Sequence, residues 1–353
     1  MKRARLVVPF VLALSVLVSA CGQKPAAPAS GGQGGTGGSA PAASSSGAAP
    51  AQGGQQASSG AVKRISIATG GTSGVYYVYG GGLAQVLSKH VPGVEATAEV
   101  TSASVENLNL LAQKSADVAF TLGDSAYDAV KGKGKFKEPL PIQALAVLYA
   151  NYTHIVVKAD SGINSVKDLA GKRVSTGSPN SGTEVIAERV LKAYGIDPQS
   201  GIKRERLGVG ESADALKDGK IDAFFWSGGL PTAGVLELAS TPGVKIKLLP
   251  TDDIIDALVK EYGPLYTPVP VPPGVYPGVD QEVIVAGVPN LLVVHRDMPE
   301  DLAYNILKAM FDNKAELEAV HPEAKKLTLQ TATKGSPVEF HPGAMKFYKE
   351  KGV

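Results

Sequence analysis

The chain contains a single cysteine, Cys21, among its 353 residues. One cysteine excludes a disulfide within the chain and leaves no cysteine pair to hold a metal. The five histidines do not stand at metal-ligand spacing from one another or from Cys21. We therefore expect no metal, and the folded part must be held together by its hydrophobic core.

The sequence also lacks an excess of either charge and the best-known catalytic and nucleotide motifs. Its 35 basic and 33 acidic residues leave a formal net charge of +2, and no basic run indicates binding to nucleic acid. No Gly-x-Ser-x-Gly elbow is present. The glycine loop at 70–74 fits neither a Walker loop nor a dinucleotide fingerprint. We expect no cofactor and no catalytic residue, although a triad assembled from distant segments is not excluded.

Residues 1–20 have the layout of a secretory signal peptide: a basic start, an uncharged apolar stretch over 6–18, and small residues before Cys21. The ending Val-Ser-Ala-Cys resembles a bacterial lipobox. That resemblance implies cleavage before Cys21 and acylation of its thiol and new amino group. The protein would then be extracytoplasmic and anchored to the cell membrane as a lipoprotein. The alternative is an ordinary signal peptide with an incidental cysteine.

Residues 21–62 are predicted to be the lipidated cysteine and a disordered tether. After Cys21 they are almost wholly Gly, Ala, Ser, Pro, Gln and Thr, with no aromatic residue and one charge, Lys24. Such a segment cannot bury enough apolar surface to offset its ordering entropy. As a flexible coil it would reach about 35 Å, which suits a spacer between a membrane and a domain. No further stretch is long and apolar enough to cross a bilayer.

The rest of the chain alternates between strand-like and helix-like patterns, and the alternation occurs twice. The segments 65–69, 70–74 and 76–90 are predicted as strand, glycine loop and helix, and 172–176, 177–182 and 183–194 repeat that order. Strand and helix in alternation indicate an α/β fold with parallel strands. Two similar α/β lobes, joined by a hinge and with a ligand cleft between them, are the simplest interpretation.

The lobes are predicted to exchange the chain twice. β-type runs at 144–149 and 153–158 are interpreted as the first crossing and runs at 283–288 and 291–295 as the return. A helix over 299–317 and a C-terminal helical stretch would belong to the first lobe. The proline-rich segment 264–278 is predicted as a loop. The predicted domains are 63–152 for the first part of lobe 1, 153–288 for lobe 2 and 289–353 for the return to lobe 1.

The glycine loops are suited to binding an anion. A helix N-terminus presents free N–H donors and the positive end of its dipole, and small hydroxyl residues add neutral hydrogen bonds. One terminus contributes about 0.3–2 kcal/mol, whereas micromolar binding needs about 8 kcal/mol, so several loops must converge on one ligand. The alternative is that these loops are only tight turns. The predicted ligand-binding residues of this kind are Gly71, Thr72, Ser73, Gly74, Ser102, Ser104, Ser178, Ser181, Gly182, Thr183 and Ser227.

Three further residues are candidates for ligand contact. Tyr76 follows the first glycine loop and Trp226 ends a strand of the second lobe, so either ring could pack over a ligand or simply belong to the core. Asp124 could accept a ligand amino group, or it could cap the helix that follows it.

Four segments taken in order resemble the TAXI family of TRAP-transporter solute receptors: 69–84, 101–107, 177–184, and 273–278 followed by Val288-Pro289. The resemblance covers residues 63–345. It implies a bilobal periplasmic-binding-protein type II fold and a ligand such as glutamate, glutamine or 2-oxoglutarate. It also implies an ion-gradient-driven membrane permease as partner. No arginine lies in the predicted cleft loops, so backbone N–H and hydroxyl groups are expected to hold the carboxylate. We expect a monomer.

Three other functions remain open. A substrate-binding lipoprotein of an ABC importer would share fold and location and differ in its partner. A secreted enzyme would need a paired base and nucleophile, which the motifs do not show. A surface adhesin or the partner of a signalling receptor could use the same bilobal core.

Overall fold

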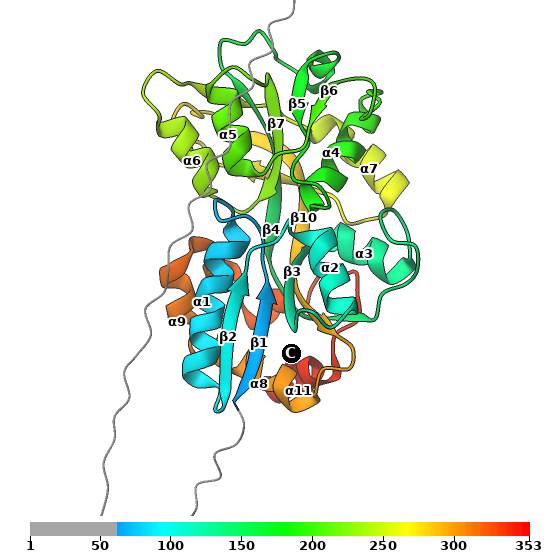
Figure 1. The fold of residues 1–353 in the computed structure, drawn as a ribbon, viewed down its shortest axis with the longest axis vertical. Coiled ribbons are helices and arrows are strands. Elements are labelled where there is room, and N and C mark those ends of the chain that lie inside the picture. The colour runs from blue at the N-terminus through cyan, green and yellow to red at the C-terminus, as the bar shows by residue number, and fades with distance from the viewer. Residues whose placement is uncertain (1–61) are drawn as a thin grey trace, which may run out of the picture. The chain divides into compact units, whose positions relative to one another are not determined.

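The computed structural model describes residues 62–353. The predicted signal peptide, Cys21 and the tether as far as Ala61 lie outside the described residues. The described part forms one ten-stranded sheet. Eight of its strands lie in the order β2-β1-β3-β10-β4-β7-β5-β6, and the other two, β8 and β9, pair with β4 and β10. Helices flank the sheet (Figure 1).

The first lobe is built on three parallel strands, β1, β2 and β3. One face of this part of the sheet packs against α1 and the C-terminal helices, and the other packs against α2 and α3. The elements are β1 (Lys63–Ala68), α1 (Val75–His90), β2 (Val94–Glu99), α2 (Ser104–Ala112), β3 (Val118–Leu122), α3 (Gly123–Lys131), α8 (Glu300–Asp312), α9 (Lys314–Val320), the 3₁₀ turn η3 (Pro322–Lys326), α10 (Leu329–Ala332) and α11 (Pro342–Glu350).

The second lobe repeats the parallel arrangement with β5, β6 and β7. Helices α4 and α7 cover one face and α5 and α6 the other. The elements are η1 (Val166–Leu169), β5 (Arg173–Ser175), α4 (Gly182–Ala193), β6 (Lys203–Glu205), α5 (Val209–Lys217), β7 (Ala223–Gly228), α6 (Ala233–Ser240), β8 (Ile246–Leu248), η2 (Asp252–Ile254), α7 (Ile255–Tyr262) and β9 (Thr267–Val271). The α/β class with two similar lobes is therefore confirmed.

Two long antiparallel strands, β4 (Ile142–Lys158) and β10 (Val283–His295), run from one lobe into the other. The prediction of two separate runs in each crossing was wrong, because each pair of runs forms one continuous strand. The predicted boundaries at 152/153 and 288/289 fall inside these strands. Register shifts follow Asn290 and Leu292, close to Pro289, and a proline cannot donate to the ladder.

Two other segments differ from the prediction. The proline-rich segment contains β9, which pairs with β10. Pro268 and Pro270 are two residues apart, so their missing N–H groups fall on the same edge and leave the alternate residues free to pair. The helix predicted over 299–317 is two helices, because Asn313 departs from helical geometry and its side-chain amide donates to the Ala309 carbonyl at 2.9 Å.

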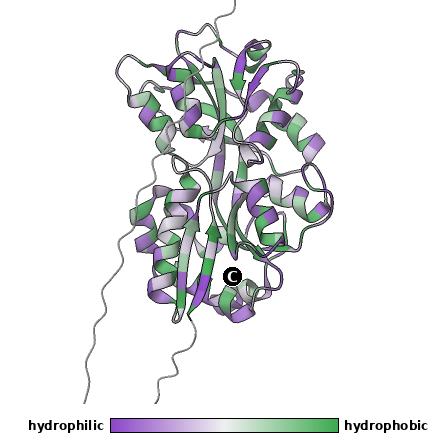
Figure 2. Cartoon of the chain, in the orientation of Figure 1, coloured by the Kyte–Doolittle hydropathy of each residue, from purple (hydrophilic) through white to green (hydrophobic). Residues whose placement is uncertain are grey.

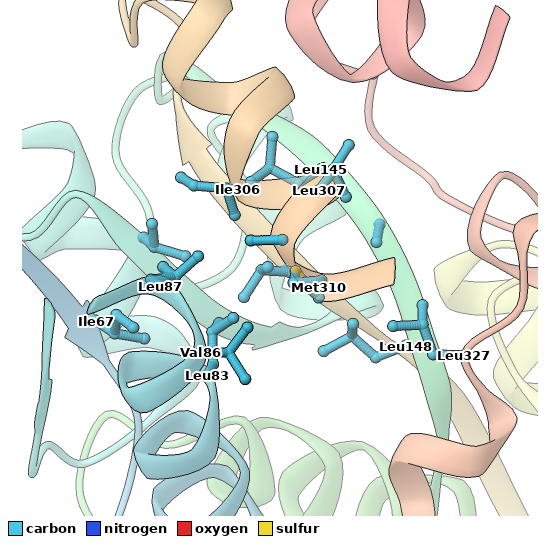
Figure 3. Packing of buried hydrophobic residues seen from close by; sticks show 14 of the residues in the cluster. Ile67, Leu83, Val86, Leu87, Leu145, Leu148, Ile306, Leu307, Met310 and Leu327 are labelled. Carbon is cyan, nitrogen blue, oxygen red and sulfur yellow. The ribbon is translucent and has the colours of Figure 1, made fainter. Parts of the chain in front are cut away.

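The core of the first lobe lies between α1, α8 and the crossing strand β4. Figure 3 shows Leu83 and Leu87 of α1 facing Ile306 and Met310 of α8, with Leu148 of β4 beside them, and each is 1% exposed or less. Full burial of one such side chain stabilises the fold by about 1.5–3 kcal/mol. Figure 2 shows the central strands as mainly hydrophobic, while the helices carry both hydrophobic and hydrophilic residues. The lobes thus have the packed cores that can hold loops in fixed positions.

No helix within residues 62–353 is both long and apolar enough to cross a bilayer. The same part of the chain contains no group of three or more His, Cys, Asp or Glu residues arranged to hold a metal ion.

Candidate ligand-binding site

A cavity lies between the two lobes, where loops from both meet. The empty space between its lining atoms is about 570 Å³, including the part open to solvent, but only about 40 Å³ of it can hold the centre of a water molecule. The cavity is therefore narrow and suits a small molecule. Its lining consists of Gly70, Gly71, Gly74, Val75, Tyr76, Ser102, Ala103, Ser104, Leu122, Gly177, Ser178, Ser181, Gly182, Thr183, Leu207, Gly208, Val209, Trp226, Ser227 and Gly228.

The first wall of the cavity is the loop between β1 and α1. Thr69 fixes the start of this loop, since its N–H and its hydroxyl both donate to the Glu99 carbonyl, at 3.1 and 2.6 Å. The Gly74 N–H donates to the Gly71 carbonyl at 3.0 Å, and α1 begins directly afterwards. No side chain caps α1, and its first turn contains no acidic residue. The start of α1 therefore faces the cavity with donors that no side chain satisfies.

Trp226 of the second lobe closes against this loop. A Cβ atom at Gly74 would lie 2.9 Å from Cη2 of the indole, closer than real contacts allow. The indole N–H donates to Thr232 Oγ1 at 2.7 Å, which fixes the ring. Glycine at position 74 is thus required by the close approach of the two lobes.

The opposite wall is the loop between β5 and α4. Its Asn180 carbonyl accepts from the Glu106 N–H of the first lobe at 3.2 Å. Gly182, the first residue of α4, packs so closely on the first lobe that an added Cβ would lie 2.5 Å from Leu122 Cδ1 and 2.6 Å from Ser104 Oγ. The structure therefore has the two lobes in direct contact around the cavity.

The polar atoms of the wall are mostly hydroxyl groups. Ser104 Oγ accepts from the Leu122 N–H, and Thr183 Oγ1 accepts from the Ser227 N–H, both at 3.1 Å. Among the described residues that line the cavity, none is Asp, Glu, Lys, Arg or His. Burial raises the pKa of the Tyr76 phenol well above its ordinary value, so this side chain is neutral. The cavity wall can therefore form hydrogen bonds with a ligand through uncharged groups.

Most of the residues predicted from the sequence do line this cavity. They are Gly71, Gly74, Tyr76, Ser102, Ser104, Ser178, Ser181, Gly182, Thr183, Trp226 and Ser227. Thr72 is exposed, and Ser73 lies against the second lobe, where its carbonyl accepts from the Gly234 N–H at 3.2 Å. Both lie beside the cavity without lining it.

Asp124 lies away from the cavity in a buried ion pair. Its carboxylate accepts from the Arg189 guanidinium at 3.2 Å and from the Tyr266 hydroxyl at 2.6 Å. Arg189 also pairs with Asp128, and its guanidinium lies 4.3 Å from the centre of the Tyr262 ring. Asp124 also accepts from the Ser125 N–H at 2.7 Å. The hydrogen-bond partners of the Asp124 carboxylate therefore come from within the protein: Arg189 of the other lobe, Tyr266, and the first turn of its own helix.

One part of the lining was not predicted. The segment Leu207–Val209 leads into α5, whose first residue is Val209, and it was not among the predicted glycine loops. Gly208 and Gly210 gave a signal, because they mark a loop and helix start that resemble the other two glycine loops. A buried arginine at position 189 left no such signal, because its partners are far away in the sequence.

Comparison with known proteins gives the family. A model of the NMT1-like family matches residues 67–352, and the chain belongs to this family. Solved structures with similar folds include a binding-protein component of an ABC phosphonate transporter from Pseudomonas aeruginosa, at 13% identity and a TM-score of 0.48, covering 74% of this chain and 78% of that one.

Two further structures are similar over most of their length. The periplasmic aliphatic sulphonate binding protein SsuA from Escherichia coli is 15% identical, with a TM-score of 0.43 and coverage of 82% of this chain and 83% of that one. An ancestral arginine-binding protein bound to arginine is 16% identical, with a TM-score of 0.45 and coverage of 74% and 97%.

Proposed function

We propose that the protein is an extracytoplasmic solute-binding receptor that captures a small carboxylate and delivers it to a membrane transporter. The observation that carries this proposal is the cavity between the lobes, walled by glycine loops and helix starts and free of acidic or basic side chains. A serine hydroxyl attacks a bond only when a base activates it, and no Asp, Glu, Lys or His of the described residues lines this cavity. Capture and release need only hydrogen bonds and closure.

The hinge supports capture by closure. Only β4 and β10 run between the lobes as continuous strands in the described part of the chain. The lobes also meet through hydrogen bonds, packed glycines and the buried pair of Arg189 with Asp124 and Asp128. Rotation about two strands would open the cavity to solvent, and a ligand bound to both walls would hold it closed.

The finer assignment follows the sequence resemblance. We propose a TAXI-type receptor of a TRAP transporter, working with an ion-gradient-driven permease, with glutamate, glutamine or 2-oxoglutarate as the ligand class. Acylation at Cys21 would hold the receptor to the membrane through residues 21–62, with lobes formed by 63–152 and 289–353 and by 153–288. A receptor of an ABC importer is the alternative. Uptake that stops when the ion gradient is collapsed, with ATP maintained, supports the first assignment.

Calorimetry with a panel of small carboxylates tests the proposal. A bound ligand at 100 times its Kd should stabilise the protein by about 2.7 kcal/mol and raise its melting temperature. Absence of binding by any carboxylate of three to six carbons would overturn the proposed function.

Wedge variants, in which a larger side chain is placed between the two lobes, test whether this cavity is the binding site. In Gly182→Val the new side chain should collide with Leu122 and Ser104, so closure fails and affinity should fall at least 100-fold. Gly74→Ala should act similarly through Trp226. The control is Gly81→Ala in α1, where an added Cβ meets no atom within 4 Å. Equal affinity in the wedge variants and the control would exclude this cavity as the site.

A further inference from the structure

The helix starts around the cavity differ in charge. Helices α1, α2, α4 and α5 begin with residues that line it, and α3 begins directly after the lining residue Leu122. Four of these helices carry an acidic residue in the first turn, namely Glu106, Asp124, Glu184 and Glu211. Of these five helices, only α1 has neither an acidic residue there nor a capping side chain. The Glu184 carboxylate of α4 is itself paired with Lys135, Arg204 and Arg206. What sets α1 apart is therefore that no side chain accepts from its first N–H groups.

The acidic residues occupy backbone donors that a ligand would otherwise use. Glu106 accepts from the Ser102 N–H at 2.6 Å, and Glu184 accepts from the Asn180 N–H at 3.0 Å. Ser181 Oγ caps α4 by accepting from the Glu184 N–H at 3.0 Å. These helix starts are already satisfied by the protein, whereas the start of α1 is open to an anion.

One negative charge can therefore be compensated in the cavity, and a second cannot. The lining residues include no basic side chain. A second carboxylate would lose its hydration without gaining a positive partner, which is strongly unfavourable in a closed site.

The second lobe contributes to the cavity a buried hydroxyl group that has no hydrogen-bond partner among the described residues. Ser227 lines the cavity and is 7% exposed, yet its Oγ has no hydrogen-bond partner among residues 62–353. Thr153, which stands opposite Ser227 in the β4–β7 ladder, also has a buried hydroxyl without a partner in that part of the chain. Directly opposed residues have Cβ atoms about 5 Å apart. A buried hydroxyl without a partner is unfavourable. We therefore expect the part of the ligand next to Ser227 to be a polar group that carries no charge.

We infer that the ligand is a monocarboxylate whose far end carries an uncharged hydrogen-bonding group, with the carboxylate at the start of α1 and the far end at Ser227. An amide or a hydroxyl has the required chemistry. This inference rests on the proposed function and narrows it, because it disfavours ligands that carry two carboxylates, such as 2-oxoglutarate.

Matched probes test the charge of the far end. Calorimetry would compare glutaramate, the monoamide, with glutarate, the diacid, and hexanoate, whose far end is apolar. Glutaramate should bind at least tenfold more tightly than either of the others. A diacid that binds as tightly as its monoamide would overturn the inference while leaving the proposed function intact. No binding by any of the three or by the wider panel would overturn both.

Ser227→Ala tests the position of the far end. This variant should lower the affinity for glutaramate about tenfold, leave that for hexanoate unchanged, and keep the ligand-free stability, because it removes a hydroxyl that has no protein partner. Ser115→Ala, at an exposed serine before β3, is the control and should change neither affinity. Equal losses for both probes, or no loss for glutaramate, would contradict the placement.

Discussion

The two lobes share a backbone frame down to individual hydrogen bonds. Thr69 and Thr176 each end the first strand of a lobe, and in each the N–H and the hydroxyl donate to one neighbouring carbonyl, that of Glu99 or Glu205. Asp117 and Asp222 each precede the third parallel strand. Each accepts from a first-strand N–H, that of Ser66 at 2.9 Å or Arg173 at 2.8 Å.

The lobes differ where this frame meets the cavity. In the first lobe α1 follows Gly74 without a capping side chain, whereas in the second lobe Ser181 caps α4 by accepting from the Glu184 N–H. The Glu184 carboxylate is paired with Lys135, Arg204 and Arg206. The equivalent helix starts thus differ in how many of their N–H groups the protein satisfies. The comparison teaches that strand geometry determines the frame, while a few residues at the helix starts determine which backbone donors stay without a side-chain partner.

The lobes also restrain each other in different ways. Arg189 of the second lobe pairs with Asp124 and Asp128 of α3, and Glu323 of the first lobe accepts from the Leu230 N–H at 2.7 Å. The first contact is a buried ion pair and the second a hydrogen bond from a neutral donor.

Removal of the arginine should have the largest effect. Arg189→Leu leaves the Asp124 carboxylate, which is 0% exposed, without its cation, and burial already raises the pKa of Asp128. Breaking a buried pair from one side costs about 3–5 kcal/mol. Urea unfolding should show this loss. Arg173→Leu removes a more exposed pair with Asp222 and should cost about 1 kcal/mol or less. Equal losses in the two variants would mean that the contact between the lobes is no stronger than a surface pair.

Much of the fold was predictable because strands, glycine loops and helix caps are local features. Residues 111–120 and 216–224 share a polar turn followed by an aspartate, and the structure gives Asp117 and Asp222 the same hydrogen bond. The crossing strands were seen as fragments, because Pro289 and the polar residues near the hinge interrupt the apolar pattern. These polar residues, among them Asn151, His154 and Asn290, are buried within strands that continue through the interruption.

The site was predictable in its loops and not in its charges. Glycine before a helix marks a possible anion site, which is why most of the lining was found. Asp124 was ambiguous because its partner, Arg189, is 65 residues away along the chain and comes close only when the lobes meet. Whether a helix start is open or satisfied depends on such contacts, and a single sequence does not contain them.

The pH dependence of unfolding should separate the lobes further. His154 of β4 stands opposite Trp226 in the second lobe, whereas in the equivalent pair of the first lobe Leu291 of β10 stands opposite Thr121. Burial lowers the pKa of His154 to about 4, and its ring contacts the Tyr152 carbonyl and the Tyr276 hydroxyl.

Since the unfolded chain has a histidine pKa near 6.5, it binds a proton more readily than the folded protein. The contribution of neutral His154 is therefore complete above about pH 6.5 and is lost as the pH falls toward 4, amounting to about 3 kcal/mol. His154→Gln should lower the stability at pH 7 and flatten its fall between pH 6.5 and 4, as followed by urea unfolding. An unchanged slope would assign the acid sensitivity to other groups.

The smallest expected effect bears most directly on the difference between the lobes. Ser181→Ala removes the cap of α4 and should cost about 1 kcal/mol in urea unfolding. It also frees the Glu184 N–H in the first turn of α4, so the second lobe becomes more like the first. The preference for a monoamide over its diacid should then shrink by a few-fold, while hexanoate binding stays the same.

Thr328→Ala, which removes a cap from α10 far along the chain, should cost stability and leave the preference intact. If Ser181→Ala lowered stability without changing the preference, the cap would be purely structural, and the preference would not depend on the donors at the start of α4.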